Sequence, residues 1–212
     1  MSYWSVPPEW YGDTCYILAG GPSLKGFDPF SIPVGGRIIV VNNSFLLCPF
    51  ADVLYFCDRA WWLQHRTEVE AQFTGQYIVT IAADVGHSKL KRLRSSGLTG
   101  LDPDPGFLRH GCNSGYQAIC LAYHFGAKRI VLLGYDMHVP PGGETHWHGG
   151  HKDTKPDKFA KLLEQNMLPR FASLVEPLAA AGVEVVNATP GSALTCWPMV
   201  GFADVLEYAP AV

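Results

Sequence analysis

Short apolar runs that alternate with longer helical patterns are the feature of this chain that most limits its fold. Six runs are rich in β-branched and aromatic residues: 14–19, 37–42, 52–57, 76–81, 128–133 and 183–187. Several are almost continuously apolar, which is typical of strands covered on both faces. Helical patterns lie between them, near 59–73, 85–94, 114–125 and 156–181. The alternation predicts an α/β fold, a Rossmann-like doubly wound and mainly parallel sheet with helices on both faces.

The chain has the size and composition of one domain. It has 212 residues, of which 48% are hydrophobic and 17% charged, and its net charge is −3. The high apolar content with a low net charge argues against a disordered chain, and the slight negative charge argues against binding of nucleic acid by bulk charge alone. We see no internal repeat and no linker, and therefore expect a single nucleotide-binding domain over 1–212. In the last helical pattern we expect bends around Pro169 and Pro177, because proline removes a helical donor.

Several classes of protein are disfavoured by what the chain lacks. The first thirteen residues contain no Lys or Arg, and no stretch reaches the roughly 18 apolar residues of a membrane span. The six cysteines lie far apart and form no CxxC pair, so reduced buried thiols are favoured over disulfides or a metal site. We expect a protein of the cytoplasm that does not bind a membrane.

Small and polar residues follow five of the six predicted strands. In doubly wound sheets ligands bind at the carboxyl ends of the strands, where these residues would meet. The candidates for substrate or nucleotide binding are Gly20, Gly21, Pro22, Ser23, Asn42, Asn43, Asp58, Tyr135, Asp136, Asn187, Thr189 and Ser192. Glycines after a strand let a ligand approach the backbone, although 20–23 could equally form a tight turn. Likewise, 187–192 fits either a base or ribose contact or an ordinary Asx/Pro turn.

A second candidate is the start of the predicted helix at 114–125. Asn113 or Ser114 can cap this helix, and Gly115 follows them. The free amides and the dipole of a helix N-terminus attract an anion, so a phosphate could bind here; a plain cap needs no ligand.

The segment 135–153 shows neither helical nor strand periodicity and holds four of the eight histidines. Structureless loops of this length are usually lids or binding loops. His138, His148 and His151 are the catalytic candidates, because a loop histidine can act as a general base near neutral pH. His146, His148 and His151 with Asp153 or Asp136 could instead hold a metal, but their spacing is not specific and we predict no metal site. In a third interpretation, these histidines are simply polar residues on the surface of the protein.

The only basic cluster is residues 89–94, KLKRLR. Its position in a helical pattern predicts a solvated helix face, with a nucleic-acid contact as the alternative.

The order of the motifs resembles a known group of enzymes. GGPSLKGFD (20–28), Asn42, NSG (113–115), LLGYD (132–136), GHKDT (150–154) and NATPGSAL (187–194) follow one another along most of the chain. This order is similar to that of the bacterial sialyltransferases of glycosyltransferase family 42. It is also similar to the related archaeal 6-hydroxymethylpterin diphosphokinases. The stretch NNSFLLCPFADVLYFCD resembles small proteins of this type from bacteriophage genomes, which would place the chain in the host cytoplasm.

The resemblance implies a role for each motif. Gly20 to Ser23 would face the donor phosphate and ribose, and Asn42, with Ser114 and Gly115 beside it, would contact the nucleotide. The residues 187–192 would border the base. His151 matches the general base that takes a proton from the acceptor hydroxyl. Two departures leave the donor open: Gly20 stands where the family often has Asn, and His138 where it has a phosphate-binding tyrosine.

Three functions are compatible with the motifs and the resemblance. The leading one is a glycosyltransferase-like enzyme that needs no cofactor and moves a sugar from a nucleotide donor to a hydroxyl, with a lid histidine as base. The second is a Mg²⁺-dependent diphosphokinase with Asp58 and Asp136 as ligands. The third is a non-catalytic nucleotide-binding phage protein. The sequence leaves open the acceptor (a sugar, a modified DNA base, a pterin-like molecule or a protein) and whether the chain forms a homo-oligomer.

Overall fold

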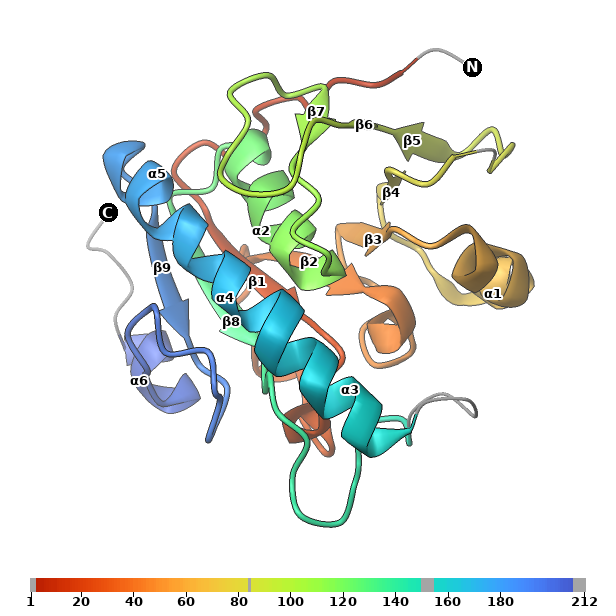
Figure 1. The fold of residues 1–212 in the computed structure, drawn as a ribbon. Helices are drawn as coiled ribbons and strands as arrows, with labels where there is room; N and C mark the ends of the chain where they lie inside the picture. The colour runs from red at the N-terminus through yellow and green to blue at the C-terminus, as the bar shows by residue number, and fades with distance from the viewer. Residues whose placement is uncertain (1–2, 84, 150–154, 208–212) are drawn as a thin grey trace.

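The central feature of the fold is a seven-stranded parallel sheet. The computed structural model describes residues 3–83, 85–149 and 155–207. The strands are β1 (Thr14–Leu18), β2 (Arg37–Val41), β3 (Val53–Phe56), β4 (Tyr77–Thr80), β5 (Leu90–Arg92), β8 (Arg129–Leu133) and β9 (Glu184–Asn187). Their order is β5-β4-β3-β2-β1-β8-β9, and every pair is parallel (Figure 1). The six predicted strands and the doubly wound parallel sheet are therefore confirmed.

The chain reverses its direction of travel across the sheet beside β1. It first adds strands outward from β1 to β5, then crosses back to place β8 on the other side of β1, followed by β9. The point between β1 and β8 is thus the topological switch point, where the loops at the carboxyl ends of neighbouring strands diverge. This is where a doubly wound sheet leaves room for a ligand.

Both faces of the sheet are covered, as the apolar runs predicted. Along β1, Cys15 and Ile17 pack into one hydrophobic cluster, whereas Tyr16 and Leu18 pack into another on the opposite face. The first cluster includes α2 (Ser114–Phe125), which contacts β1, β2 and β3, and α5 (Val175–Ala180), which contacts β9. The second includes residues of the 3₁₀ segment Asn42–Leu46, of α1 (Arg59–Gln72) and of α6 (Phe202–Glu207).

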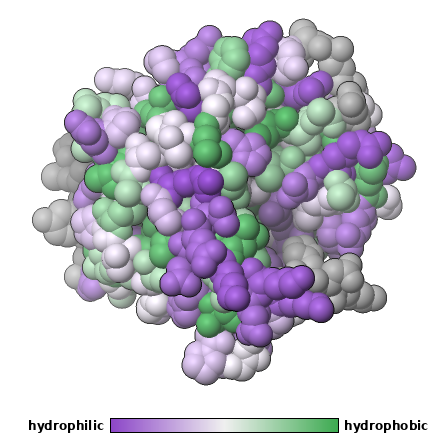
Figure 2. Space-filling model, viewed as in Figure 1, coloured by the Kyte–Doolittle hydropathy of each residue, from purple (hydrophilic) through white to green (hydrophobic). Residues whose placement is uncertain are grey.

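The helical segment 156–180 crosses the front of the molecule in Figure 1, and its winding changes shortly before Pro169 and before Pro177. It consists of α3 (Pro156–Leu162), a π-helical turn (Leu163–Met167), α4 (Leu168–Phe171), a 3₁₀ turn (Ala172–Leu174) and α5. The amide of Leu168 bonds to the carbonyl of Leu163, five residues back, directly before Pro169, which has no amide hydrogen. Figure 2 shows mainly hydrophilic residues along the outer side of this segment.

The helix expected at 85–94 is wrong. Residues Leu90–Arg92 form the edge strand β5 instead, pairing with Ile78 to Thr80 of β4. Pairing with an exposed sheet edge outweighs the weak local helix preference, and lysines and arginines suit an edge strand because they oppose aggregation. The backbone amide of Trp4 covers part of this edge by bonding to the carbonyl of Arg92 at 2.7 Å. Two further short strands, β6 (Arg94–Ser95) and β7 (Phe107–Leu108), form a separate small sheet.

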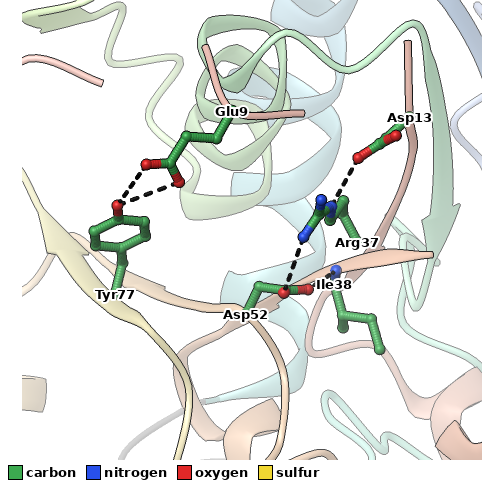
Figure 3. Close-up of polar contacts among 6 residues, drawn as sticks. All are labelled: Glu9, Asp13, Arg37, Ile38, Asp52 and Tyr77. Atoms are coloured by element: carbon green, nitrogen blue, oxygen red, sulfur yellow. Dashed lines mark hydrogen bonds and ion pairs between the residues drawn. The ribbon is translucent and has the colours of Figure 1, made fainter. Parts of the chain in front are cut away.

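Polar contacts hold the amino ends of the strands, at the opposite edge from the strand-end loops (Figure 3). Arg37, at the start of β2, donates from Nε to the carboxylate of Asp13 at 2.8 Å and lies 3.8 Å from that of Asp52. The carboxylate of Asp52 also accepts the amide of Ile38 at 2.7 Å. Tyr77 of β4 donates its hydroxyl to Glu9 at 3.0 Å. These contacts stabilise the end of the sheet at which the strands begin, opposite the carboxyl ends of the strands.

Two smaller expectations concern the cysteines and the membrane. All six cysteines are free thiols, and Cys15, Cys48 and Cys120 are buried. Within the described part of the chain, no helix combines the length and apolarity needed to cross a bilayer.

Candidate functional site

A pocket of about 430 Å³ lies at the carboxyl ends of β1, β2, β3 and β8, across the topological switch point. Most of the sequence-predicted site residues line it together: Gly20, Gly21, Pro22, Asn42, Asn43, Asp58, Asn113, Ser114, Gly115, Tyr135, Asp136, His138 and His148. The parallel sheet brings them together, because all its strands end on the same side.

The turn after β1 depends on close contact between backbone and a carboxylate. The amide of Gly21 donates to the carbonyl of Gly134 at 2.9 Å, and the buried carboxylate of Asp136 accepts from Ser23. The Ser23 amide lies 3.0 Å from Oδ1 of Asp136 and its hydroxyl 2.7 Å from Oδ2. A Cβ at Gly21 would lie 1.8 Å from Oδ2 of Asp136, so only glycine fits. Ser23 therefore holds the turn in place and does not itself line the pocket.

Two asparagines follow β2. Asn42 adopts a left-handed backbone conformation with φ of 51°, and its buried Oδ1 has no hydrogen-bond partner within the described residues. A buried acceptor without a partner costs about 1–3 kcal/mol, so this atom fits a donor on a ligand. The neighbouring Asn43 uses its Oδ1 to accept the indole N–H of Trp61.

Backbone strain is concentrated in the pocket. In 3–83, 85–149 and 155–207, three residues other than glycine have a positive φ: Asn42, Cys112 and Met137, the latter two at 55°. All three line the pocket. The left-handed conformation costs a non-glycine residue roughly 1–2 kcal/mol, and such strain persists mainly at functional sites.

The N-terminus of α2 forms one wall. The side chain of Asn113 caps the helix by accepting the amides of Gly115 at 2.7 Å and Tyr116 at 3.1 Å, as the sequence predicted. This leaves the amide of Ser114 without an acceptor in the described chain, at the positive end of the helix dipole. The Ser114 hydroxyl lies 3.1 Å from the thiol of Cys57.

Cys57 is a pocket residue that the strand-end argument did not include. Burial and the charge of Asp58 raise the pKa of this thiol to about 12, so it is protonated at neutral pH. It is therefore no thiolate nucleophile. Asp58 itself precedes α1 without capping it, since its side chain accepts no hydrogen bond from the first turn.

The polar side chains after β8 form hydrogen bonds to the backbone of the protein. Tyr135 donates its hydroxyl to the carbonyl of Gly115 at 2.9 Å, and burial raises its pKa well above the ordinary value. His138 lies in the pocket, with its Nδ1 at 2.9 Å from the carbonyl oxygen of Asp136.

The following loop is attached to the turn after β1. The amide of Trp147 bonds to the carbonyl of Gly20 at 3.1 Å, and its indole donates to the hydroxyl of Ser44 at 3.2 Å. The ring of His146 lies over Gly20, 3.1 Å from the position a Cβ would take. This loop therefore closes one side of the pocket.

Two expectations for this loop concern His151 and a metal site. His151, and with it the GHKDT motif, lies outside the described residues. Among the residues that are described, no three His, Cys, Asp or Glu side chains come together as a metal site.

The candidate residues after β9 do not line the pocket. Asn187, Thr189 and Ser192 are buried and hydrogen-bonded to the protein. Thr189 accepts the amide of Tyr135 at 2.9 Å, and Asn187 donates to Ser192 at 3.0 Å and to the carbonyl of Leu194 at 2.9 Å. In this structure these side chains position the loop after β8, which does line the pocket.

Five further residues that line the pocket were not predicted from the sequence. His110 and Cys112 come from the turn before α2, and Phe159, Leu163 and Met167 from the helical segment 156–167. Met167 contacts the site directly, since its sulfur accepts from the amide nitrogen of Asn113 at 3.2 Å. The apolar residues show only an ordinary amphipathic pattern, whereas the glycine at 111, next to His110, was a usable signal for a tight turn.

Replacing Asn42 by glycine is expected to stabilise the unliganded protein by about 1 kcal/mol. Glycine accepts the positive φ without strain and removes the unpartnered Oδ1, and these gains exceed the entropic cost of an added glycine. Chemical unfolding measures this change. A loss of stability in this variant would mean that Oδ1 is already satisfied.

Comparison with solved structures finds distant likenesses. The chain is similar to the solved structure of an α-2,3-sialyltransferase from Campylobacter jejuni in its apo form, with 14% sequence identity and a TM-score of 0.49. The match covers 92% of this chain and 84% of that one. No family model matches the sequence, and neither does any curated protein. At this distance the likeness assigns neither a family nor an activity.

Proposed function

We propose that the protein is a glycosyltransferase-like enzyme, which transfers a sugar from a nucleotide donor to a hydroxyl group with a histidine of the loop 135–153 as general base. The observation that carries the proposal is the strained pocket at the switch point: its three left-handed residues and the unpartnered Oδ1 of Asn42 are costs that a bound ligand would offset. The motif order that resembles the family 42 sialyltransferases supports the choice of reaction.

The charge of the pocket favours a ligand with few phosphates. Its described lining contains Asp58 and Asp136 but neither Lys nor Arg, so a triphosphate would bring its own negative charge next to two carboxylates. A single phosphate can instead rely on the amide of Ser114 and the dipole of α2.

The two carboxylates of the pocket are also the metal ligands that the Mg²⁺-dependent alternative requires. Asp136 already accepts two hydrogen bonds from Ser23, one on each oxygen, and is thus committed to the turn after β1. Asp58 would then be the one carboxylate of the pair left for Mg²⁺, the lower end of the one or two that usually join the phosphates in such a site.

His138 has the form that a general base requires. The carbonyl of Asp136 can only accept a hydrogen bond, so Nδ1 of His138 carries the hydrogen and Nε2 of the neutral ring has a free lone pair. The resemblance instead favours His151, and His148 also lines the pocket. Either way, the base would take the proton of the acceptor hydroxyl as the oxygen attacks the sugar carbon and the nucleotide phosphate leaves.

Thermal unfolding with CMP, UDP, GDP and ATP, each with Mg²⁺ and with a chelator, tests the proposal. Binding to the folded state at a hundred times the dissociation constant adds about 2.7 kcal/mol, which raises the melting temperature by roughly 5–10 °C. We expect CMP or a nucleoside diphosphate to give this shift in the presence of chelator. A shift with ATP that requires Mg²⁺ would favour the diphosphokinase, and donor binding without any hydrolysis or transfer would favour a non-catalytic protein.

A further inference from the structure

His110 is a pocket residue with no assigned role. It lies in the turn before α2, and its backbone is held on both sides: its amide donates to the carbonyl of Gly97 at 2.8 Å, and its carbonyl accepts from the side chain of Gln117. His110 is exposed and is one of the residues that line the pocket, as is Ser114.

The ring of His110 is fixed by a hydrogen bond from the backbone. The amide of Cys112 donates to Nδ1 at 3.1 Å. An amide can only donate, so Nδ1 must keep its lone pair and the neutral ring must carry its hydrogen on Nε2. In the neutral ring, the turn therefore selects the tautomer that is a donor at Nε2.

His138 is held in the opposite tautomer. Its Nδ1 donates to a carbonyl, so its Nε2 is an acceptor, and the ring can gain a proton there without losing its bond. A neutral His138 therefore offers a lone pair to the pocket, whereas a neutral His110 offers a hydrogen. As neutral rings, the two cannot substitute for each other toward an anionic oxygen.

We propose that His110 is a ligand-binding residue, whose Nε2–H donates to an anionic phosphate oxygen together with the N-terminus of α2. The inference rests on the proposed function for the nature of the ligand. His110 would supply a neutral hydrogen-bond donor to a pocket whose described lining has no Lys or Arg. The phosphate contact then comes from His110 and not from His138, which the resemblance places where the family has a phosphate-binding tyrosine.

The tautomers can be measured without any ligand. In the full chain labelled with ¹⁵N-histidine, long-range ¹H–¹⁵N correlation spectra distinguish protonated from unprotonated ring nitrogens. We expect His110 to be protonated on Nε2 and His138 on Nδ1. A His110 ring protonated on Nδ1, or averaged between both forms, would overturn the inference.

The contact with phosphate is tested by His110→Asn. The Oδ1 of asparagine can replace Nδ1 as acceptor for the Cys112 amide, so the turn is kept while the donor at the Nε2 position is lost. Calorimetry at pH 8 should show the affinity for CMP, UMP, AMP or GMP, whichever binds the wild type, falling about tenfold or more. The affinity for the matching nucleoside should stay unchanged. His87→Asn is the control, because His87 pairs with Glu70 outside the pocket.

The outcomes separate this inference from the proposed function. Equal nucleotide affinity of wild type and His110→Asn would overturn the role of His110 while leaving nucleotide binding intact. If none of the nucleotides binds the wild type, the proposed function fails. The role of His110 is then decided by titration with orthophosphate: we expect it to shift the Nε2 resonance of His110, and an unmoved resonance would overturn it.

Discussion

Replacing Gly21 by alanine is expected to destabilise the protein by about 3 kcal/mol and to abolish nucleotide binding. The added Cβ would lie 1.8 Å from Oδ2 of Asp136 and 2.5 Å from the carbonyl oxygen of Gly134, distances at which the backbone must move. Such a shift would break the bonds between Asp136 and Ser23 that hold the turn after β1. Thermal unfolding should show a melting temperature lower by roughly 6–12 °C.

The cause of this effect is space and not backbone conformation. Gly21 has a φ of −66°, which alanine adopts freely. Gly20→Ala is a matched control next to it, because its Cβ would meet only the His146 side chain, at 3.1 Å, and should cost much less stability. In a double-mutant cycle, Asp136→Ala should offset part of the Gly21→Ala cost. A Gly21→Ala protein as stable as Gly20→Ala would contradict the turn geometry.

The second large effect is expected from His138→Asn. The amide nitrogen of asparagine can replace Nδ1–H as donor to the carbonyl of Asp136, so the local structure is kept while the acceptor at Nε2 is removed. We expect donor affinity to remain and transfer to fall by about 10²–10⁴-fold, the usual contribution of a general base. The readout is kcat/KM as a function of pH: the wild type should lose activity at acid pH as the base is protonated, and the variant should lack this limb.

His151→Ala is the parallel variant, because the motif resemblance assigns the base to that residue. If His151→Ala loses turnover and the acid limb while His138→Asn keeps both, the base is His151. Normal turnover in both variants would contradict a base at either position. His65→Asn, at a histidine that does not line the pocket, is the control for the substitution itself.

The location of the site could be predicted from the sequence, but the composition of its walls could not. Residues at the ends of four strands, together with the cap at Asn113, line one pocket, because parallel strands all end on the same side of a sheet. Phe159 and Met167 come from a segment far along the chain, and their spacing is the same as in any buried helix. Their contribution depends on how that segment lies across the sheet.

Some local sequence patterns are compatible with two different structures. Asn187, Thr189 and Ser192 have the polar side chains of a binding loop, yet they are buried and bond to the backbone around Tyr135 and Leu194. The basic run 89–94 has the pattern of a helix face, but its residues Leu90–Arg92 pair with β4 at the sheet edge. In both cases the local pattern fits two structures, and packing against distant parts of the chain selects one of them.

By itself, the sequence determined the parallel sheet, its burial on both faces and the edge where polar residues gather. Strong local patterns account for this: near-continuous apolar runs, glycines after strands and an asparagine before a helix. Only the tertiary structure decided which polar atoms face the pocket and which form hydrogen bonds within the protein. It also decided which nitrogen of His110 and of His138 carries the hydrogen. Those properties depend on hydrogen-bond partners brought together by folding, and no pattern along the chain encodes them.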